Sequence, residues 1–140
     1  MLEKDSDLRK KFYHPPVSKL IGFRLVQMGK GKAVCEMAVK KQHENFVGTV
    51  HGGIICDIAD ATMGFAFASL LRTDQRGVTV EFKVNFLRPV YAGNFLRAHA
   101  KTIFHGKSLY YLECEVKDLS RKLIAKASST CKVISGLNPA

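Results

Sequence analysis

The chain has 140 residues, of which 46% are hydrophobic and 24% are charged, as in ordinary soluble globular proteins. The longest apolar run, 63–71, is too short to span a bilayer, and the charged N-terminus lacks the apolar core of a secretory signal. The net charge of +10 favours anionic partners, but no interleaving of aromatic and basic residues suggests a base-stacking platform. We therefore expect a cytoplasmic protein that binds neither nucleic acid nor membranes.

The predicted elements are a short helix, two strands, one long helix and four more strands. Pro15 and Pro16 are expected to end the short helix, because the residue before a proline avoids helical angles. The short connections between the later strands suit antiparallel hairpins. We expect one domain, 1–140, with an N-terminal helix or tail at 1–13 and a core at 14–135. The expected elements are helix 6–13, strands 19–29 and 32–40, a helix from about 53 to 71, and strands 78–86, 95–104, 108–118 and 122–134.

Two patterns decide the predicted architecture. In 78–86, valine and phenylalanine alternate with polar residues, which predicts a strand with one buried face. The long helix is apolar nearly all round, so it must be covered on most sides. One curved antiparallel sheet wrapped around one helix satisfies both patterns, which gives an α+β fold. Any apolar surface left exposed would favour a dimer.

The sequence His51-Gly52-Gly53 directly precedes the long helix. The first N–H groups of a helix have no intrahelical partner, and the helix dipole there favours negative charge. Glycine lets a ligand approach these groups closely, so the backbone could form an oxyanion hole. Alternatively, the two glycines only allow the loop to turn into the helix.

Two acids, Asp57 and Asp60, interrupt the apolar helix. Burial of an unpaired carboxylate is unfavourable and usually raises its pKa. Asp57 is close enough to the N-terminus to be stabilised by the helix dipole or by solvent. Asp60 lies deeper among apolar residues, so it is paired, exposed in a cleft, or functional.

No other residue provides an obvious nucleophile or metal site. The sequence lacks a GxSxG elbow, and its four cysteines and five histidines show no zinc-ligand spacing. We expect no metal and no cofactor. An acid as base or nucleophile, with backbone N–H groups as the electrophilic partner, fits thioester hydrolysis. His51 could be a general base, a ligand, or a structural residue.

The spacing of Asn45, His51-Gly52-Gly53 and Asp60 resembles that in the PaaI-like acyl-CoA thioesterases of the hotdog-fold superfamily. The flanking segments 14–39 and 77–90 resemble strands of the same family. The resemblance implies a hotdog fold, an antiparallel sheet wrapped around one helix, and a homodimer or homotetramer. It also implies acyl-CoA hydrolysis at the dimer interface.

The resemblance also implies roles for individual residues. Asp60 of one subunit would activate water or attack the thioester directly, facing Gly52 of the other subunit. The Gly52 N–H group, helped by Asn45, would polarise the carbonyl. Thr79 would orient the water, and His51 would bond near the substrate or support the loop.

The acyl-CoA substrate would also give the basic charge a use, because coenzyme A carries several phosphates. Residues expected to bind the substrate or coenzyme A are Gly53, Arg88, His105, Gly106 and Lys107. Arg88 and Lys107 could equally be solvated surface residues. The alternative function is a non-catalytic hotdog module that binds acyl-CoA or an acidic acyl-carrier protein.

Overall fold

The computed structural model describes residues 15–135, with Ser135 described by its backbone alone. The short helix expected at 6–13 lies outside the described residues. No helix within 15–135 has the length and apolar character needed to cross a membrane. The elements are α2 (Pro16–Ile21), β1 (Phe23–Gly29), β2 (Lys32–Ala38), the 3-10 helix η1 (Lys41–His43), α3 (Gly52–Ala68), β3 (Gln75–Phe86), β4 (Phe95–His105), β5 (Leu109–Lys117) and β6 (Leu123–Ser135).

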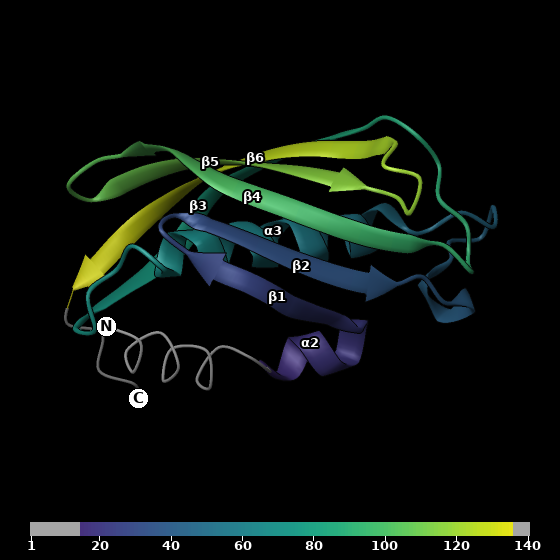
Figure 1. Ribbon diagram of the computed structural model, residues 1–140, viewed down its shortest axis with the longest axis horizontal. Coiled ribbons are helices and arrows are strands. Elements are labelled where there is room, and N and C mark those ends of the chain that lie inside the picture. Colours follow the sequence, from purple (N-terminus) through teal and green to yellow (C-terminus); the bar gives the residue numbers. More distant parts are fainter. Residues whose placement is uncertain (1–14, 136–140) are drawn as a thin grey trace.

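The six strands form one antiparallel sheet in the order β1-β2-β4-β5-β6-β3. Figure 1 shows this sheet curving around α3, and α3 contacts all six strands. The buried side of α3 forms the centre of the core, with Ile58, Ala59, Met63 and Ala66 fully buried. This arrangement confirms the predicted hotdog fold.

The segment before β1 corrects the first strand prediction, because residues 19–21 are helical. Pro16 occupies the first position of α2, where the fixed φ and the missing N–H group of proline are well tolerated. The two prolines therefore precede and begin a helix. Gly22 ends this helix with a φ of 102°, a left-handed conformation that favours glycine.

Strand β3 corrects a second prediction, because its apolar residues do not share one buried face. A β-bulge between Thr79 and Glu81 shifts the register by one residue. Val78, before the bulge, lies on the outer face and is 42% exposed. Phe82, after the bulge, is half-buried against the core. With Val78 turned outward, Thr79 faces α3.

Strand β3 is also an open edge of the sheet. It pairs with β6 on one side, and no strand within residues 15–135 pairs with its other side. It is 12 residues long and carries exposed apolar side chains, with Val80 55% and Phe86 52% exposed. A long apolar edge strand is a template for pairing with another chain.

The C-terminal end of α3 is held by contacts with two strands and a turn. A Cβ atom at Gly77 would lie 1.9 Å from Phe67 Cε1, so the glycine allows α3 to approach β3 closely. The Phe67 ring packs edge-on against Tyr110 of β5, with ring centres 4.8 Å apart. Ser69 Oγ accepts a hydrogen bond of 2.8 Å from Gly31 N in the β1–β2 turn. These contacts fix the direction of α3 within the sheet.

Candidate active site

The N-terminus of α3 presents a backbone N–H group that has no hydrogen-bond partner among residues 15–135. His51 is the N-cap residue, and its Nδ1 accepts a hydrogen bond of 2.9 Å from Gly53 N. His51 therefore supports the start of the helix. Within the described part of the chain, the Gly52 N–H group makes no hydrogen bond. Because the helix dipole is positive at this end, the Gly52 N–H group can donate to an oxyanion.

Asp60 of α3 meets Thr79 of β3. Thr79 Oγ1 donates a hydrogen bond of 3.2 Å to Asp60 Oδ1 and lies 3.8 Å from Sγ of the buried Cys131. The bulge that follows Thr79 directs its hydroxyl group toward α3. Asp60 is exposed in the single chain, so its carboxylate is open to a water molecule or a substrate.

The surroundings of Asp60 make it more basic than an ordinary aspartate. Although solvent reaches the carboxylate, desolvation by nearby protein atoms raises its pKa above the usual 3.8, and the hydrogen bond from Thr79 lowers it in part. Desolvation and then the charge of Asp60 raise the pKa of Asp57. A carboxylate with a raised pKa, within reach of solvent, suits a general base.

Asp60 and Thr79 line a cavity of about 760 Å³ that lies along α3, between β3 and the start of β1. Such a volume is typical of small-molecule sites. Asp57 also lines this cavity, although no functional role was expected for it. The wall is otherwise mostly apolar and includes Val17, Phe23, Phe65, Phe67 and Leu71.

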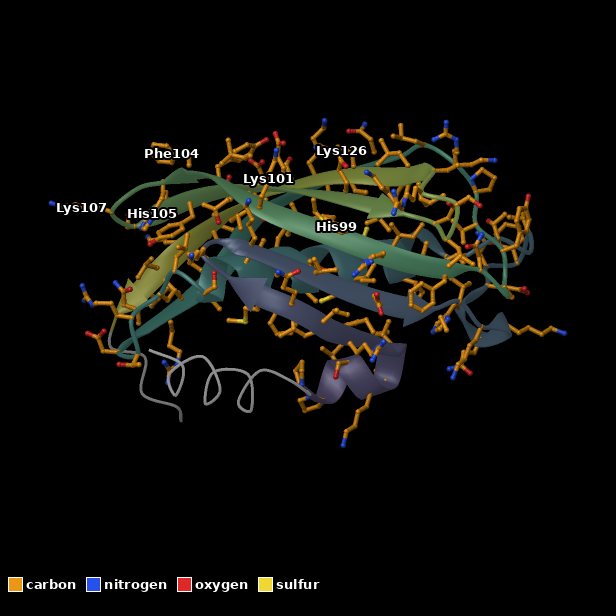
Figure 2. All side chains as sticks on the ribbon, in the orientation of Figure 1. His99, Lys101, Phe104, His105, Lys107 and Lys126 are labelled. Carbon is orange, nitrogen blue, oxygen red and sulfur yellow. The ribbon has the colours of Figure 1, made fainter. Side chains whose placement is uncertain are left out.

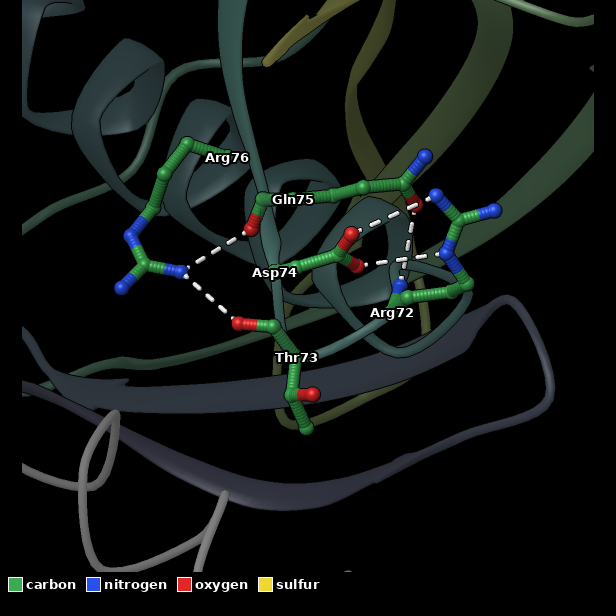
Figure 3. A network of polar contacts seen from close by, with 5 residues as sticks. All are labelled: Arg72, Thr73, Asp74, Gln75 and Arg76. Carbon is green, nitrogen blue, oxygen red and sulfur yellow. Dashed lines mark hydrogen bonds and ion pairs between the residues drawn. The ribbon is translucent and has the colours of Figure 1, made fainter. Parts of the chain in front are cut away.

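The loop after α3 borders the same cavity with two arginines. Arg72 Nε and Nη2 donate to Asp74 at 3.2 and 3.4 Å, and Arg72 N donates to Gln75 Oε1 at 3.0 Å (Figure 3). Arg76 Nη1 donates to the carbonyl oxygens of Thr73 and Gln75 at 3.3 and 3.0 Å. The hydrogen bond from Arg72 lowers the pKa of Asp74. Exposed ion pairs add little stability, so we attribute to this network mainly the shape of the loop.

Gly52 does not line the cavity that contains Asp60. It lines a smaller cavity of about 340 Å³ together with Phe86 and Arg88. Arg88 Nη1 donates a hydrogen bond of 2.7 Å to the Leu123 carbonyl. Along the axis of α3, Gly52 and Asp60 are about 12 Å apart. Within one chain, the two groups therefore cannot act on the same thioester carbonyl.

Asn45 organises the loop that leads to His51. Its Oδ1 accepts hydrogen bonds from Val47 N and Thr49 N at 3.0 and 3.2 Å, and its Nδ2 donates to Thr49 Oγ1 at 2.9 Å. These bonds use one of the two N–H groups of the Asn45 side chain. The expected contact of Asn45 with a substrate stays a prediction. Phe46, the next residue, is fully exposed in the single chain.

The predicted coenzyme A residues 105–107 lie at the β4–β5 hairpin (Figure 2). His105 Nε2 and Tyr110 Oη are hydrogen-bonded at 2.5 Å. Because Tyr110 also packs against Phe67, the hairpin lies at the C-terminal end of α3. Arg88 instead lies near the N-terminus of α3. The structure of one chain therefore does not bring these predicted binding residues together.

Comparison with known proteins identifies the family. The family model of the thioesterase superfamily matches residues 47–125, which is more than half of the chain. The chain belongs to the thioesterase superfamily. The matched region contains the N-terminus of α3, Asp60 and Thr79.

Several known proteins are similar to this chain over most of its length. A protein of Saccharolobus solfataricus is 36% identical over 111 residues, which cover 79% of this chain and 78% of that protein. Human acyl-coenzyme A thioesterase 13 is 30% identical over 109 residues, 76% of each chain. The E. coli PaaI protein from the phenylacetic acid degradation operon superposes with a TM-score of 0.86 at 26% identity, covering 94% of this chain and 93% of that one. The chain is thus a thioester hydrolase with a hotdog fold.

The cavity of this thioesterase-superfamily chain also contains residues that the sequence did not single out. Cys131 lies beside Thr79 because β3 and β6 pair in that register. Phe23 reaches the cavity from β1, at the other edge of the sheet. Neither residue belongs to a local motif. Only the register and curvature of the sheet, which a single sequence does not give, could have identified them.

Proposed function

We propose that this thioester hydrolase cleaves acyl-coenzyme A to a free acid and coenzyme A. In this proposal Asp60 is the base or nucleophile, and the Gly52 N–H group of a second copy donates to the oxyanion. The main observation that supports this proposal is the hydrogen bond of 3.2 Å between Thr79 and Asp60 on the wall of a mostly apolar cavity. The similarity to human acyl-coenzyme A thioesterase 13 supports coenzyme A as the thiol.

The proposed reaction needs only an acid and a backbone donor. Asp60 accepts a proton from water while the water oxygen bonds to the thioester carbonyl carbon. The Gly52 N–H group donates to the oxyanion of the tetrahedral intermediate. The carbon–sulfur bond then breaks, and the thiolate takes up the proton, which leaves a carboxylic acid and a thiol. Alternatively, an Asp60 oxygen attacks the carbonyl carbon and the carbon–sulfur bond breaks to release the thiolate. Water then hydrolyses the resulting anhydride, which returns the Asp60 carboxylate and releases the acid, and the thiolate takes up the remaining proton.

Three observations support a two-fold dimer as the functional unit. Gly52 and Asp60 line different cavities of one chain. Strand β3 is an open, apolar edge, and the fully exposed Phe46 lies in the loop before α3. A two-fold interface uses the same surface on both copies, so each Asp60 can face the Gly52 of the other copy.

The charge of the chain supports an anionic substrate. Arg88 lies beside Gly52 in the smaller cavity, where a coenzyme A phosphate can meet it, and the net charge of +10 favours the approach of coenzyme A. Residues 105–107 lie at the other end of α3. They contact the same coenzyme A molecule only if they come from the second copy.

The direct test is thiol release from a panel of acyl- and aryl-coenzyme A substrates by the purified protein. We expect hydrolysis that saturates with substrate and shows a clear preference among acyl groups. Binding of acyl-CoA without any thiol release would contradict the proposal and would favour a non-catalytic binding module. The same panel identifies the preferred acyl group.

Thr79→Val is expected to move the acid limb of the pH profile to higher pH. The hydrogen bond from Thr79 lowers the pKa of Asp60, so its loss should raise that pKa. A base acts only when deprotonated, so kcat/KM should then begin to fall at a higher pH as the pH is lowered. We also expect a loss of roughly 10- to 100-fold in kcat. Thr79→Ser keeps the hydroxyl group and should keep the original limb, whereas an unchanged limb in Thr79→Val would show that the hydrogen bond does not tune Asp60.

A further inference from the structure

Gly64 lies in the interior of α3, on the wall of the large cavity. Glycine is unfavourable in a helix interior, where its backbone loses more freedom than that of other residues. Its backbone is not in the left-handed region, so its conformation does not require glycine. Apart from its chain neighbours and the backbone of α3 itself, a Cβ atom there would meet no atom of the described residues within 4 Å. The missing side chain therefore leaves open space in the cavity.

The position of Gly64 relative to Asp60 gives that space a use. Residues four apart on a helix are surface neighbours, about 5–6 Å apart at Cβ. Gly64 therefore follows Asp60 on the same face, and Ala68 follows Gly64. All three residues line the same cavity, and so does Leu71, which follows the end of α3. A thioester carbonyl at Asp60 would lay the first part of its acyl chain over Gly64 and a later part over Ala68.

The α3 side of the cavity wall along this path is apolar. Between Asp60 and Arg72, the residues of this segment that line the cavity are all uncharged and apolar: Ala61, Gly64, Phe65, Phe67, Ala68 and Leu71. From Asp60 to Ala68, the last residue of α3, the path extends about 12 Å along the helix, and Leu71 lines the cavity beyond the helix end. A path of this length suits an extended aliphatic chain better than an aryl group, which would occupy about one turn of the helix.

We infer that this cavity holds the acyl chain of medium- or long-chain aliphatic acyl-CoA, and that Gly64 and Ala68 set the chain length accepted. The inference rests on the proposed function, because it takes Asp60 as the position of the thioester carbonyl. A side chain added at Gly64 should block the chain close to the carbonyl. A larger side chain at Ala68, about 6 Å further along the helix, should block only longer chains.

The test compares Gly64→Leu and Ala68→Leu in thiol release from acetyl-, octanoyl- and palmitoyl-CoA. In Gly64→Leu, the kcat/KM on octanoyl- and palmitoyl-CoA, each divided by the kcat/KM of the same variant on acetyl-CoA, should fall roughly 10- to 200-fold relative to the unaltered protein. Ala68→Leu should lose a similar factor on palmitoyl-CoA alone. Gly64→Ala is the matched control, since it adds a single methyl group and favours the helix. If Gly64→Leu does not fold, Gly64→Val makes the same comparison with a smaller side chain.

Two results would overturn the inference. One is that Gly64→Leu and Ala68→Leu lose activity at the same acyl-chain length. The other is an equal loss on every substrate together with dissociation of the dimer in sedimentation, which would show that Gly64 serves contact between copies. Binding of palmitoyl-CoA by calorimetry in an Asp60→Asn background separates this inference from the proposed function. Weaker binding of palmitoyl-CoA when Gly64→Leu is added to Asp60→Asn supports the role of Gly64, whether or not the unaltered protein releases thiol. An absence of thiol release by the unaltered protein would contradict the proposed hydrolysis but not the role of Gly64.

Discussion

Asp60→Asn is expected to lose nearly all hydrolysis of acyl-CoA while KM changes little. An amide of the same size can neither take a proton from water nor attack a carbonyl. The fall in kcat should be roughly 10²- to 10⁴-fold if Asp60 is a general base, and larger if it is a nucleophile. Thiol release at saturating acyl-CoA measures this loss. Turnover at the original rate would remove Asp60 from the reaction.

The stability of Asp60→Asn provides the control for this result. Desolvation raises the pKa of Asp60 in the folded chain, so the folded state binds more protons than the unfolded state between the usual 3.8 and the raised value. The contribution of Asp60 to stability therefore falls as the pH rises through this window, and asparagine has no such loss. Asp60→Asn should accordingly have a Tm at neutral pH at least equal to that of the unaltered protein. A lower Tm would point to misfolding as the cause of lost turnover.

Gly52→Pro is expected to reduce kcat by roughly 10²- to 10³-fold, the usual effect of removing one oxyanion donor. Gly52 is the first residue of α3, a position where proline is favoured. His51 has an extended conformation, with φ −60° and ψ 135°, which a following proline accepts. The substitution therefore removes the N–H group and should leave the helix intact. Circular dichroism checks the helix, and thiol release measures kcat.

Gly52→Ala is the matched control for this prediction. Its Cβ atom would also lie about 3.0 Å from Phe86 Cζ, but it keeps the N–H group. The half-exposed Phe86 ring can move slightly, so Gly52→Ala should lose much less activity than Gly52→Pro. Equal losses in the two variants would attribute the effect to the contact with Phe86.

Mixed dimers of Asp60→Asn and Gly52→Pro test whether the site crosses the interface. If each site combines Asp60 of one copy with Gly52 of the other, the mixed dimer has one intact site and one site that lacks both groups. Co-expression should then restore activity that neither variant has alone. If both groups acted within one chain, no site would be intact and activity would stay low.

The sequence predicted those parts of the fold that depend on local pattern. The apolar run after His51 predicted α3, and the short turns predicted the hairpins of β4, β5 and β6. The same reasoning separated the two acids by their depth in the helix, and the structure gives Asp60 alone a hydrogen bond to Thr79. Asp57 nevertheless lines the same cavity, which helical spacing alone did not indicate.

The parts that the sequence did not predict depend on contacts between distant residues. The alternation in 78–86 gives no sign of the bulge, because apolar and polar residues continue to alternate without a break through Val80, where the register shifts. The position of Cys131 follows from the pairing of β3 with β6. The Pro15-Pro16 pair was interpreted as the end of one helix, whereas Pro16 also fits the first turn of another.

The bulge in β3 divides one strand into a segment for chemistry and a segment for packing. Before it, Thr79 faces Asp60, and after it, Phe82 faces the core. Moving Thr79 away from Asp60 without disturbing the core would therefore take the deletion of one residue rather than a substitution. Such a deletion would exchange the two faces of the strand before the bulge and direct Val78 toward the carboxylate. In evolutionary terms, the length of this segment should be more tightly constrained than the identity of any residue in it except Thr79 and Gly77.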